Sequence, residues 1–233
     1  MILISLLTVV VLLFVITGFF AFKKEETILD TVTDAIKFKT EYESLNGKIN
    51  DKTNDVYPSV QISDTNKFVY KNEEEILKIL ESKSGVIYFG FKSSLGCRRI
   101  IKALDRASQN KNIEAIYYVD IENIRDVLAL DENNKIVTEK EGNSNYYKLL
   151  KILDDYLADY LLKSDEDTSI NTGEKRLYAP TVVAVLNGDI VDFYESNEED
   201  TIDDLSKEEE NKLVATYENL IEKTLIGLCD EGC

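Results

Sequence analysis

Residues 85–99 read GVIYFGFKSSLGCRR and decide the fold. The β-branched and aromatic run that ends at Phe91 predicts a buried strand. The two serines that follow supply a helix N-cap, and the apolar spacing of residues 100–104 continues the helix. Cys97 is therefore expected in the first turn of a helix that follows directly on a strand. At that position, free N–H groups and the helix dipole favour a thiolate.

The residues around Cys97 raise the question of redox chemistry. Arg98 and Arg99 add positive charge beside the thiol in a chain that is otherwise acidic. In a C-x-x-C pair the partner cysteine stands three residues earlier, where this sequence has Ser94. A serine hydroxyl cannot form a mixed disulfide, so Ser94 is expected to act only as an N-cap. Two interpretations of Cys97 stay open: a reactive thiol, and an inert, partly buried cysteine.

A hairpin is predicted near the other end of the chain. Residues 178–185 form its first strand, Asn187 and Gly188 are typical of a two-residue turn, and residues 189–193 form its second strand. Pro180 stands near the start of this hairpin, where a strand tolerates proline. Between the hairpin and the Cys97 helix, residues 113–119 predict a strand that completes a right-handed parallel βαβ unit.

The remaining elements follow from apolar spacing and capping residues. Short strands are expected at residues 60–62, 68–70 and 135–138, and a short helix or turn at residues 120–130. Residues 46–58 are predicted to be a linker or surface loop and residues 164–175 an exposed acidic loop. Helices are expected at residues 26–45, 72–81, 145–162 and 206–228. The first of these helices either continues a membrane helix as a stalk or packs on the domain, and Ser206 with Glu209 predicts a capping box at the start of the last.

The order of strand, cysteine-bearing helix, proline-entered hairpin and C-terminal helix resembles the thioredoxin-like fold. Residues 89–98, FGFKSSLGCR, are similar to the F-G-F-x-x-C-P-x-C-R segment of thioredoxin-like lipoproteins and bacteriocin transport accessory-type proteins of Gram-positive bacteria. The resemblance covers roughly Phe68 to Leu225. It implies an α/β fold with a thioredoxin-like central mixed sheet flanked by helices. The chain departs from the motif where Ser94 and Leu95 replace its first cysteine and its proline.

The same resemblance implies a binding site. It predicts a cis peptide bond before Pro180, facing Cys97, and a surface formed by Ala179, Pro180 and Thr181 that binds the backbone of a client polypeptide. In this family that surface lies beside the redox pair. The resemblance therefore implies that client binding can survive the loss of the cysteine at position 94.

The N-terminal segment predicts a membrane anchor. Residues 1–22 read MILISLLTVVVLLFVITGFFAF and contain no charged side chain. At about 1.5 Å per residue, a helix of this length reaches roughly the 30 Å hydrocarbon thickness of a bilayer. No Lys or Arg precedes the segment, no small-residue cleavage pattern follows it, and Phe19 stands where a lipoprotein carries its lipid-attached cysteine. We therefore expect an uncleaved transmembrane anchor over residues 1–24 rather than a cleaved signal peptide.

The domain order follows from this anchor. Residues 25–58 are expected to form a stalk helix and linker, residues 59–228 the thioredoxin-like domain, and residues 229–233 a cysteine-containing tail. Lys23 and Lys24 flank the anchor and by the positive-inside rule favour a cytoplasmic domain. The family resemblance favours export, and a start codon further upstream would reverse the charge rule. We expect a single-pass cell-membrane protein with an extracytoplasmic domain.

Composition excludes several function classes. The chain has 44 acidic and 27 basic residues and a formal net charge of −17, which argues against nucleic acid or anionic lipid as a partner. It has no histidine, so histidine metal sites, Ser-His-Asp triads and Cys-His proteases are excluded. No Walker or dinucleotide-binding motif appears. Neither a metal nor another cofactor is expected, and the acidity is compatible with a basic peptide client.

Two further cysteines close the chain as Cys229-Asp-Glu-Gly-Cys233. They are expected either to form a local disulfide or to act as a mobile thiol pair that reaches Cys97. A zinc site from this pair alone is not expected, because structural zinc takes four ligands.

Two functions are compatible with these patterns. The first is a membrane-tethered, thioredoxin-like protein with a degenerate S-x-x-C site that binds or presents a peptide or protein client without catalysing dithiol exchange. The second is a thiol–disulfide oxidoreductase that uses Cys97 with Cys229 or Cys233 as the resolving thiol. The serine at position 94 favours the first function, and the C-terminal cysteine pair keeps the second open.

Overall fold

The computed structural model describes residues 32–51, 54–164, 168–196 and 205–225. The chain divides into two units, Met1–Val32 and Thr33–Cys233, and the second contains every element named below. The expected anchor over residues 1–24 lies outside the described residues, as do Cys229 and Cys233. Within the described part of the chain, none of the helices combines the length and the apolar character needed to cross a membrane.

A five-stranded mixed sheet forms the centre of the described unit. Its strands follow the order β1-β3-β2-β8-β9. The first three run parallel to one another, whereas β8 is antiparallel to β2 and β9 is antiparallel to β8. The bounds are β1 (Phe68–Tyr70), β2 (Gly85–Gly90), β3 (Ile116–Asp120), β8 (Thr181–Leu186) and β9 (Asp189–Glu195). The predicted α/β class with a mixed central sheet is confirmed.

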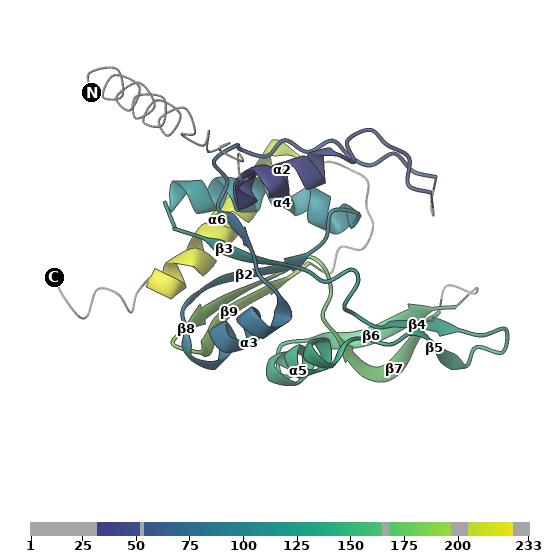
Figure 1. Cartoon of the computed structure of the whole chain (residues 1–233). Coiled ribbons are helices and arrows are strands. Elements are labelled where there is room, and N and C mark those ends of the chain that lie inside the picture. Colours follow the sequence, from purple (N-terminus) through teal and green to yellow (C-terminus); the bar gives the residue numbers. More distant parts are fainter. Residues whose placement is uncertain (1–31, 52–53, 165–167, 197–204, 226–233) are drawn as a thin grey trace, which may run out of the picture. The chain divides into compact units, whose positions relative to one another are not determined.

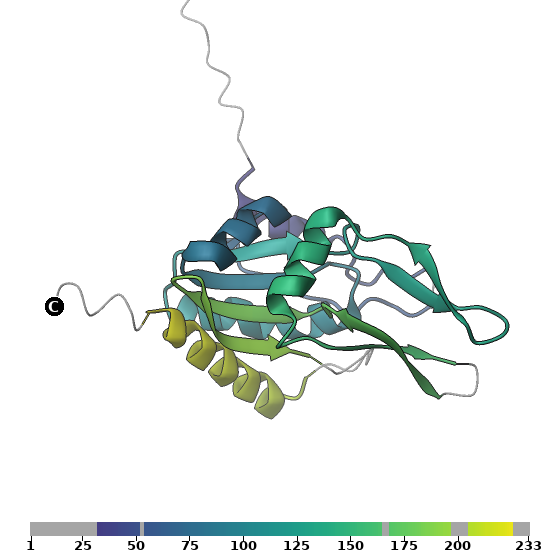
Figure 2. The same cartoon turned by 90° about the horizontal axis from the view of Figure 1, so that it is seen from below.

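Helices cover both faces of this sheet (Figures 1 and 2). On one face, α4 (Leu95–Asn110) packs against α6 (Lys207–Leu225), and α3 (Glu73–Ser82) packs against α5 (Ser144–Leu153) on the other. Because side chains alternate along a strand, Tyr88 of β2 enters the first core and its neighbour Phe89 enters the second. Burial on both faces explains why β2 and β8 are continuous apolar runs in the sequence.

The helix before the sheet, α2 (Asp34–Glu43), is part of the compact unit. Its Phe38 and Tyr42 are fully buried in the core that α4 and α6 share, and the Phe38 ring stacks on Phe68 of β1 at 4.0 Å between centroids. The sequence left two alternatives for this helix, a stalk that continues the membrane helix or a helix that packs on the domain. Residues 34–43 pack on the domain.

Predicted helix starts agree with the capping geometry. Asn72 and Glu75 form a capping box at the start of α3. The Ser206 hydroxyl accepts the Glu209 N–H at 3.3 Å while the Glu209 carboxylate accepts the Ser206 N–H at 2.8 Å, which confirms the box before α6. Ser94 caps α4 by accepting the Cys97 N–H at 3.2 Å.

Between β3 and β8 the chain forms two hairpins that extend from one end of the sheet (Figures 1 and 2). They pair β4 (Val127–Leu130) with β5 (Ile136–Lys140), and β6 (Ala158–Lys163) with β7 (Ser169–Arg176). Residues 127–130 are thus a strand rather than a helix or turn, and residues 169–176 are a strand rather than an acidic loop. The strand expected at residues 135–138 is confirmed as part of β5.

The helix predicted over residues 145–162 is wrong in its second half. α5 ends at Leu153, and a turn in which the Tyr156 N–H donates to the Leu153 carbonyl leads into β6. Leu157 and Tyr160 continue the helical spacing by coincidence, since Tyr160 is buried through the two-residue alternation of a strand. Pairing with β7, which no local pattern reveals, decides the conformation here.

Residues 60–62, predicted as a strand, form none. Instead the Asn46 side chain donates to the Val60 carbonyl at 2.8 Å and accepts the Val60 N–H at 2.9 Å. These two bonds occupy the backbone groups that a neighbouring strand would need. The segment is consequently held as an irregular layer over the first core.

Candidate functional site

Cys97 and Arg98 lie on the core side of the first turn of α4. The Arg98 side chain is 2% exposed and donates to three carbonyl oxygens and to the side-chain oxygen of Asn46. The carbonyls belong to Tyr42 (2.8 Å), Pro58 (2.7 and 2.9 Å) and Lys92 (3.2 Å). Arg98 therefore ties α2 and the loop after it to α4. Its charge is committed to these oxygens rather than held free to activate a thiol.

The Cys97 thiol is enclosed by tyrosines. The residue is 0% exposed and belongs to the same core cluster as Tyr42, Tyr88, Tyr118 and Tyr217. The Tyr88 hydroxyl lies 2.9 Å from the Tyr42 hydroxyl. Burial raises the pKa of the Cys97 thiol above its ordinary value, although the nearby hydroxyl groups of Ser94 and Tyr88 oppose the rise. Helix position alone predicts a thiolate, but desolvation outweighs it here.

Gly90 permits this arrangement within the Phe89-Gly90-Phe91 segment. A Cβ at Gly90 would collide with the ring and hydroxyl of Tyr88, which lies along β2 toward the start of α4. Glycine at this position therefore leaves the space in which Tyr88 reaches Cys97 and Tyr42.

Ser94 faces the opposite way, toward the proline loop. Its hydroxyl donates to the Ala179 carbonyl at 3.3 Å while capping α4. The Ala179–Pro180 peptide bond is cis. Pro180 and Thr181 are buried, and the Thr181 hydroxyl donates to the Tyr178 carbonyl at 2.8 Å. Of the three residues predicted to bind a client, only Ala179 lies partly exposed at the surface.

A groove of about 390 Å³ opens between the start of α4, the proline loop and the β6–β7 hairpin. Ser94 and Ala179 line it, but Cys97 does not. It reaches the loop after α2 at Asn50 and Asp55 and the hairpin at Tyr160 and Leu161. Its size lies within the range of about 300–1,000 Å³ that is usual for ligand sites. We call this hollow the proline-loop groove.

Two arginines that the sequence did not single out line the proline-loop groove. Arg176 is 6% exposed, donates to the Asp126 carboxylate at 3.3 Å and lies over the Tyr160 ring at 3.9 Å. Arg125 lies over the Phe91 ring at 4.6 Å. Burial and the charge of Arg176 lower the pKa of Arg125. Arg125 lies shortly after the carboxyl end of β3, in the parallel part of the central sheet, where ligands often bind. Arg176 is the last residue of β7, in the antiparallel β6–β7 hairpin.

A carboxylate lies behind the proline loop. Glu195 of β9 is opposite Thr181 in the sheet register and accepts the Tyr178 N–H at 3.4 Å. Burial raises the pKa of Glu195 to about 7, and the hydrogen bond from the Tyr178 N–H opposes that rise. Sequence reasoning missed this residue because its pairing across the hairpin, not its local pattern, brings it to the loop.

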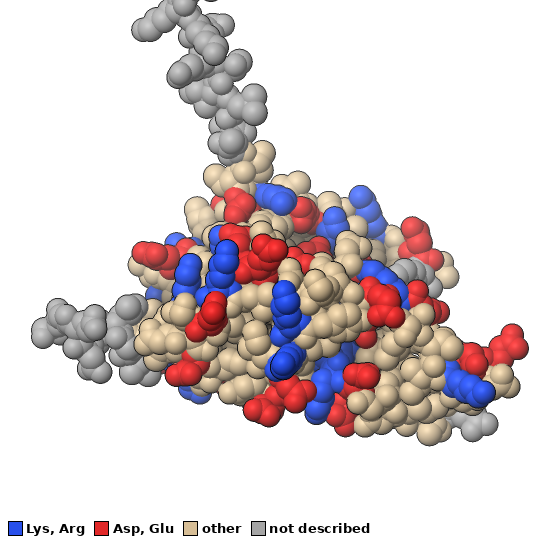
Figure 3. Space-filling model, turned by 60° about the horizontal axis from the view of Figure 1, so that its bottom comes forward, with Lys and Arg blue, Asp and Glu red and all other residues tan. Residues whose placement is uncertain are grey.

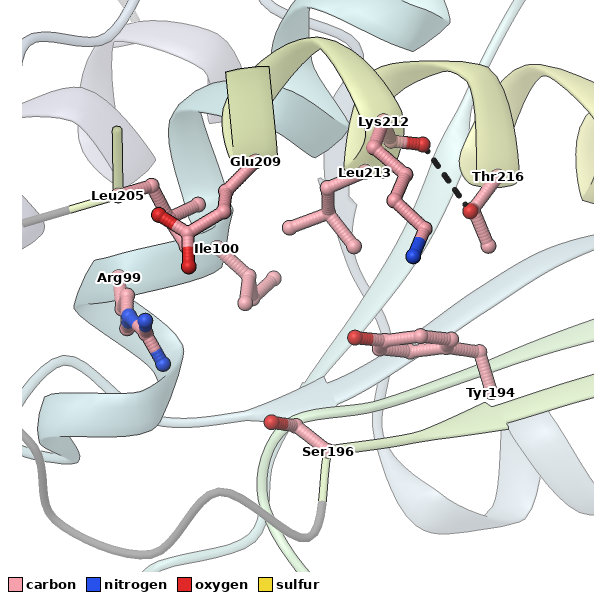
Figure 4. A pocket seen from close by; sticks show the side chains of 9 residues that line it. All are labelled: Arg99, Ile100, Tyr194, Ser196, Leu205, Glu209, Lys212, Leu213 and Thr216. Atoms are coloured by element: carbon pink, nitrogen blue, oxygen red, sulfur yellow. Dashed lines mark hydrogen bonds between the residues drawn. The ribbon is translucent and has the colours of Figure 1, made fainter. Parts of the chain in front are cut away.

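A second cavity of about 360 Å³ lies between α4, α6 and the end of β9 (Figure 4). Ile100 and Leu213 form its apolar side, while Glu209 and Lys212 of α6 and Arg99 of α4 add charge. It contains none of the residues predicted from the thioredoxin-like resemblance. The proline-loop groove is therefore the site that the predicted residues Ser94 and Ala179 share.

The surface seen in Figure 3 carries Lys and Arg side chains interspersed with Asp and Glu side chains. Within the described residues, no group of three or more Cys, Asp or Glu side chains is arranged to hold a metal ion. Comparisons of the chain with models of protein families, with curated proteins and with solved structures gave no match. The geometry of the groove is thus the basis for assigning a function.

Proposed function

We propose that this chain is a thioredoxin-like protein that binds an extended peptide or protein client in the proline-loop groove and does not catalyse dithiol exchange. The observation that carries the proposal is the division of the first turn of α4. Ser94 faces the groove and the Ala179 carbonyl, whereas the Cys97 thiol is fully buried. The residue at the reactive position therefore has no thiol, and the thiol that is present is not at the surface.

The sheet and the proline loop support the thioredoxin-like part of the proposal. A mixed central sheet flanked by helices, with a cis-proline before the hairpin, is what the family resemblance implies. The hairpins β4–β5 and β6–β7 are additions to that plan. The second of them contributes one wall of the groove, so it is available to shape the specificity for a client.

Backbone groups at the groove suit an extended peptide. Ala179 is partly exposed, and among the described residues its N–H has no hydrogen-bond acceptor. A client in extended conformation offers a carbonyl for that N–H, as in recognition by strand addition. The exposed side chain of Leu161, on the opposite wall, offers an apolar contact beside it.

As part of this function, residues 1–22 anchor the chain in the cell membrane as one uncleaved helix, with the groove on the extracytoplasmic side. The support is the absence of charge over these residues. Deleting residues 1–24 should move the protein from the membrane to the soluble fraction. Mass spectrometry of the native protein should find residues 1–22 still attached and without lipid; a chain that begins beyond Phe22 contradicts the anchor.

Peptide binding is tested with the full chain in a mild detergent and a library of short random peptides. A variant with a single thiol in the groove shows where the peptide binds. It combines Ser94→Cys with Cys97→Ala, Cys229→Ser and Cys233→Ser. Peptides retained by the wild type should slow maleimide labelling of this thiol. Retention of no peptide, or retention without protection of the thiol, contradicts the proposal.

Catalysis is tested with a disulfide-containing peptide and dithiothreitol. The wild type should exchange no faster than the Cys97→Ala variant, and Ser94→Cys should gain activity because it restores a second thiol next to Cys97. Full activity in the wild type that Cys97→Ala or Cys229→Ser abolishes would establish the oxidoreductase instead.

A further inference from the structure

We propose that the proline-loop groove recognises a carboxylate of the peptide that it binds, and that Arg125 is the residue that pairs with it. The inference rests on the proposed function and adds a substrate class to it: clients with an Asp or Glu side chain, or with a free C-terminal carboxylate, at the position facing Arg125. The overall acidity of the chain suggests the opposite preference, for basic peptides.

Arg125 is a partly buried cation that has no anionic partner among the described residues. Its backbone N–H donates to the Ile121 carbonyl at 3.2 Å, which fixes the turn after β3, and its guanidinium lies on the Phe91 ring. Among the described residues, no hydrogen bond or ion pair involves the Arg125 side chain. Removing a guanidinium from water without a partner is unfavourable, and a bound carboxylate restores what is lost.

Arg176, the neighbouring cation, already has an anionic partner within the protein. Its guanidinium donates to both the carboxylate and the carbonyl of Asp126 at 3.3 Å and stacks on Tyr160. Because these contacts hold it in place, Arg176 acts on Arg125 as a fixed positive charge, and this repulsion lowers the pKa of Arg125. A carboxylate in the groove is attracted by both charges, and of the two guanidinium groups only that of Arg125 makes no hydrogen bond among the described residues.

The start of α4 adds to the same potential. Leu95 and Gly96, the first two residues of this 16-residue helix, line the groove, so its positive end faces the same space as Arg125. Asp55 is the carboxylate that lines the groove on the opposite side. Among the described residues, the site thus combines two guanidinium groups and a helix start with one rim carboxylate, while Asp126 offsets Arg176.

Other polar groups of the groove are occupied and do not compete. The Ser93 hydroxyl donates to Glu122 at 2.5 Å. The Tyr178 hydroxyl donates to the Asp159 carbonyl at 3.1 Å and accepts the Leu161 N–H at 3.2 Å. Arg125 therefore stands out as the side chain with donors available to a ligand, in a planar fork that matches a carboxylate.

The test is a selection of short random peptides on the full chain, with free C-termini in one library and amidated C-termini in the other. The wild type should enrich Asp and Glu over Asn and Gln at one position of the amidated library if a side chain is recognised. If the C-terminus is recognised, it should retain only the free-acid library. Arg125→Gln should weaken the affinity of the chain for the selected acidic peptides about tenfold or more, as expected for loss of a charge-assisted pair.

Two variants serve as controls. Arg106→Gln removes the same charge from an exposed position of α4, where it pairs with Glu210, and should leave the preference intact. Arg125→Lys keeps the charge and should retain part of the preference, which separates loss of recognition from loss of folding. Binding of peptides with no preference for a carboxylate overturns this inference and leaves the proposed function standing. Binding of no peptide overturns both.

Discussion

The two sides of the first turn of α4 differ in what surrounds them. On the core side, Cys97 and Arg98 are at most 2% exposed, and every donor contact of Arg98 ends on an oxygen of the protein itself. On the groove side, Ser94 and Arg125 are partly exposed, and Arg125 has no such contact among the described residues. The core side therefore stabilises the fold, whereas the groove side is free to bind a ligand.

This difference shows how a cysteine at a helix start can be inert. The same turn supplies the dipole and the free N–H groups that lower a thiol pKa, yet burial raises the pKa of Cys97. A helix start lowers the pKa of a thiol only when the thiol can be solvated or paired as an anion. Placing serine on the exposed side and cysteine on the buried side keeps the fold while removing the chemistry.

Loss of the Arg98 contacts should produce the largest effect on the core side. Arg98→Ala removes the buried guanidinium donors from the carbonyls of Tyr42 and Pro58 and should lower the free energy of unfolding by about 3–5 kcal/mol. Thermal melting followed by circular dichroism should show a Tm lower by about 10 °C. The matched control, Arg106→Ala on the exposed face, should cost about 0.5 kcal/mol. Equal losses in the two variants would contradict the structural role of Arg98.

Removal of one hydroxyl from the tyrosine cluster should have a smaller effect. Tyr88→Phe deletes the hydrogen-bond partner of the buried Tyr42 hydroxyl and should cost about 1–2 kcal/mol in urea unfolding. Tyr147→Phe removes an exposed hydroxyl that donates to Glu141 and should cost less than about 0.5 kcal/mol. An unchanged midpoint in Tyr88→Phe would mean that its hydroxyl is solvated rather than shared within the core.

A pH-dependent difference is expected at Glu195, behind the proline loop. Its folded-state pKa of about 7 lies above the ordinary 4.5, so the folded protein holds a proton that the unfolded chain releases between these values. Stability from this group is therefore lost as the pH rises through that window and is fully present below it. Since the carboxyl is partly exposed and screened by solvent, we expect its ionisation above that pH range to lower the free energy of unfolding by about 1 kcal/mol.

Glu195→Gln should remove this dependence. The difference in Tm, variant minus wild type, should be about 2–4 °C larger at about pH 8 than at about pH 5. Glu132→Gln, at the exposed turn of the β4–β5 hairpin, is the control and should show no such trend. A constant difference between variant and wild type at all pH values would show that Glu195 titrates in the folded protein as it does in the unfolded chain.

How far the sequence predicts this molecule depends on how much each segment is buried. Strand β2, helix α4 and the β8–β9 hairpin are buried, capped or closed by an Asn-Gly turn, so spacing and turn residues were sufficient to find them. The β6–β7 hairpin is largely exposed and polar, and its conformation is decided by pairing between the two strands. A helical stripe that includes Tyr160 was therefore indistinguishable from the true strand.

The candidate site divides in the same way. Ser94 as a cap and the cis bond at Pro180 follow from the segment around Cys97 and from the resemblance that it carries. Arg125, Arg176 and Glu195 reach the groove or the loop through long-range packing, and a charge in an acidic, polar stretch gives no local sign of that. The rule that ligands bind at the carboxyl ends of parallel strands is a signal that could have drawn attention to Arg125, and the sequence interpretation did not use it.

Thiol labelling tests the two-sided account of α4 most directly. In the full chain with Cys229→Ser and Cys233→Ser, the single thiol is placed either at its natural position, Cys97, or one turn earlier by Ser94→Cys with Cys97→Ala. The thiol at position 94 should react with maleimide under native conditions at least about a hundredfold faster than Cys97, which should react only after opening of the core. Rapid native labelling of Cys97, at a rate equal to that of the thiol at position 94, would contradict the account.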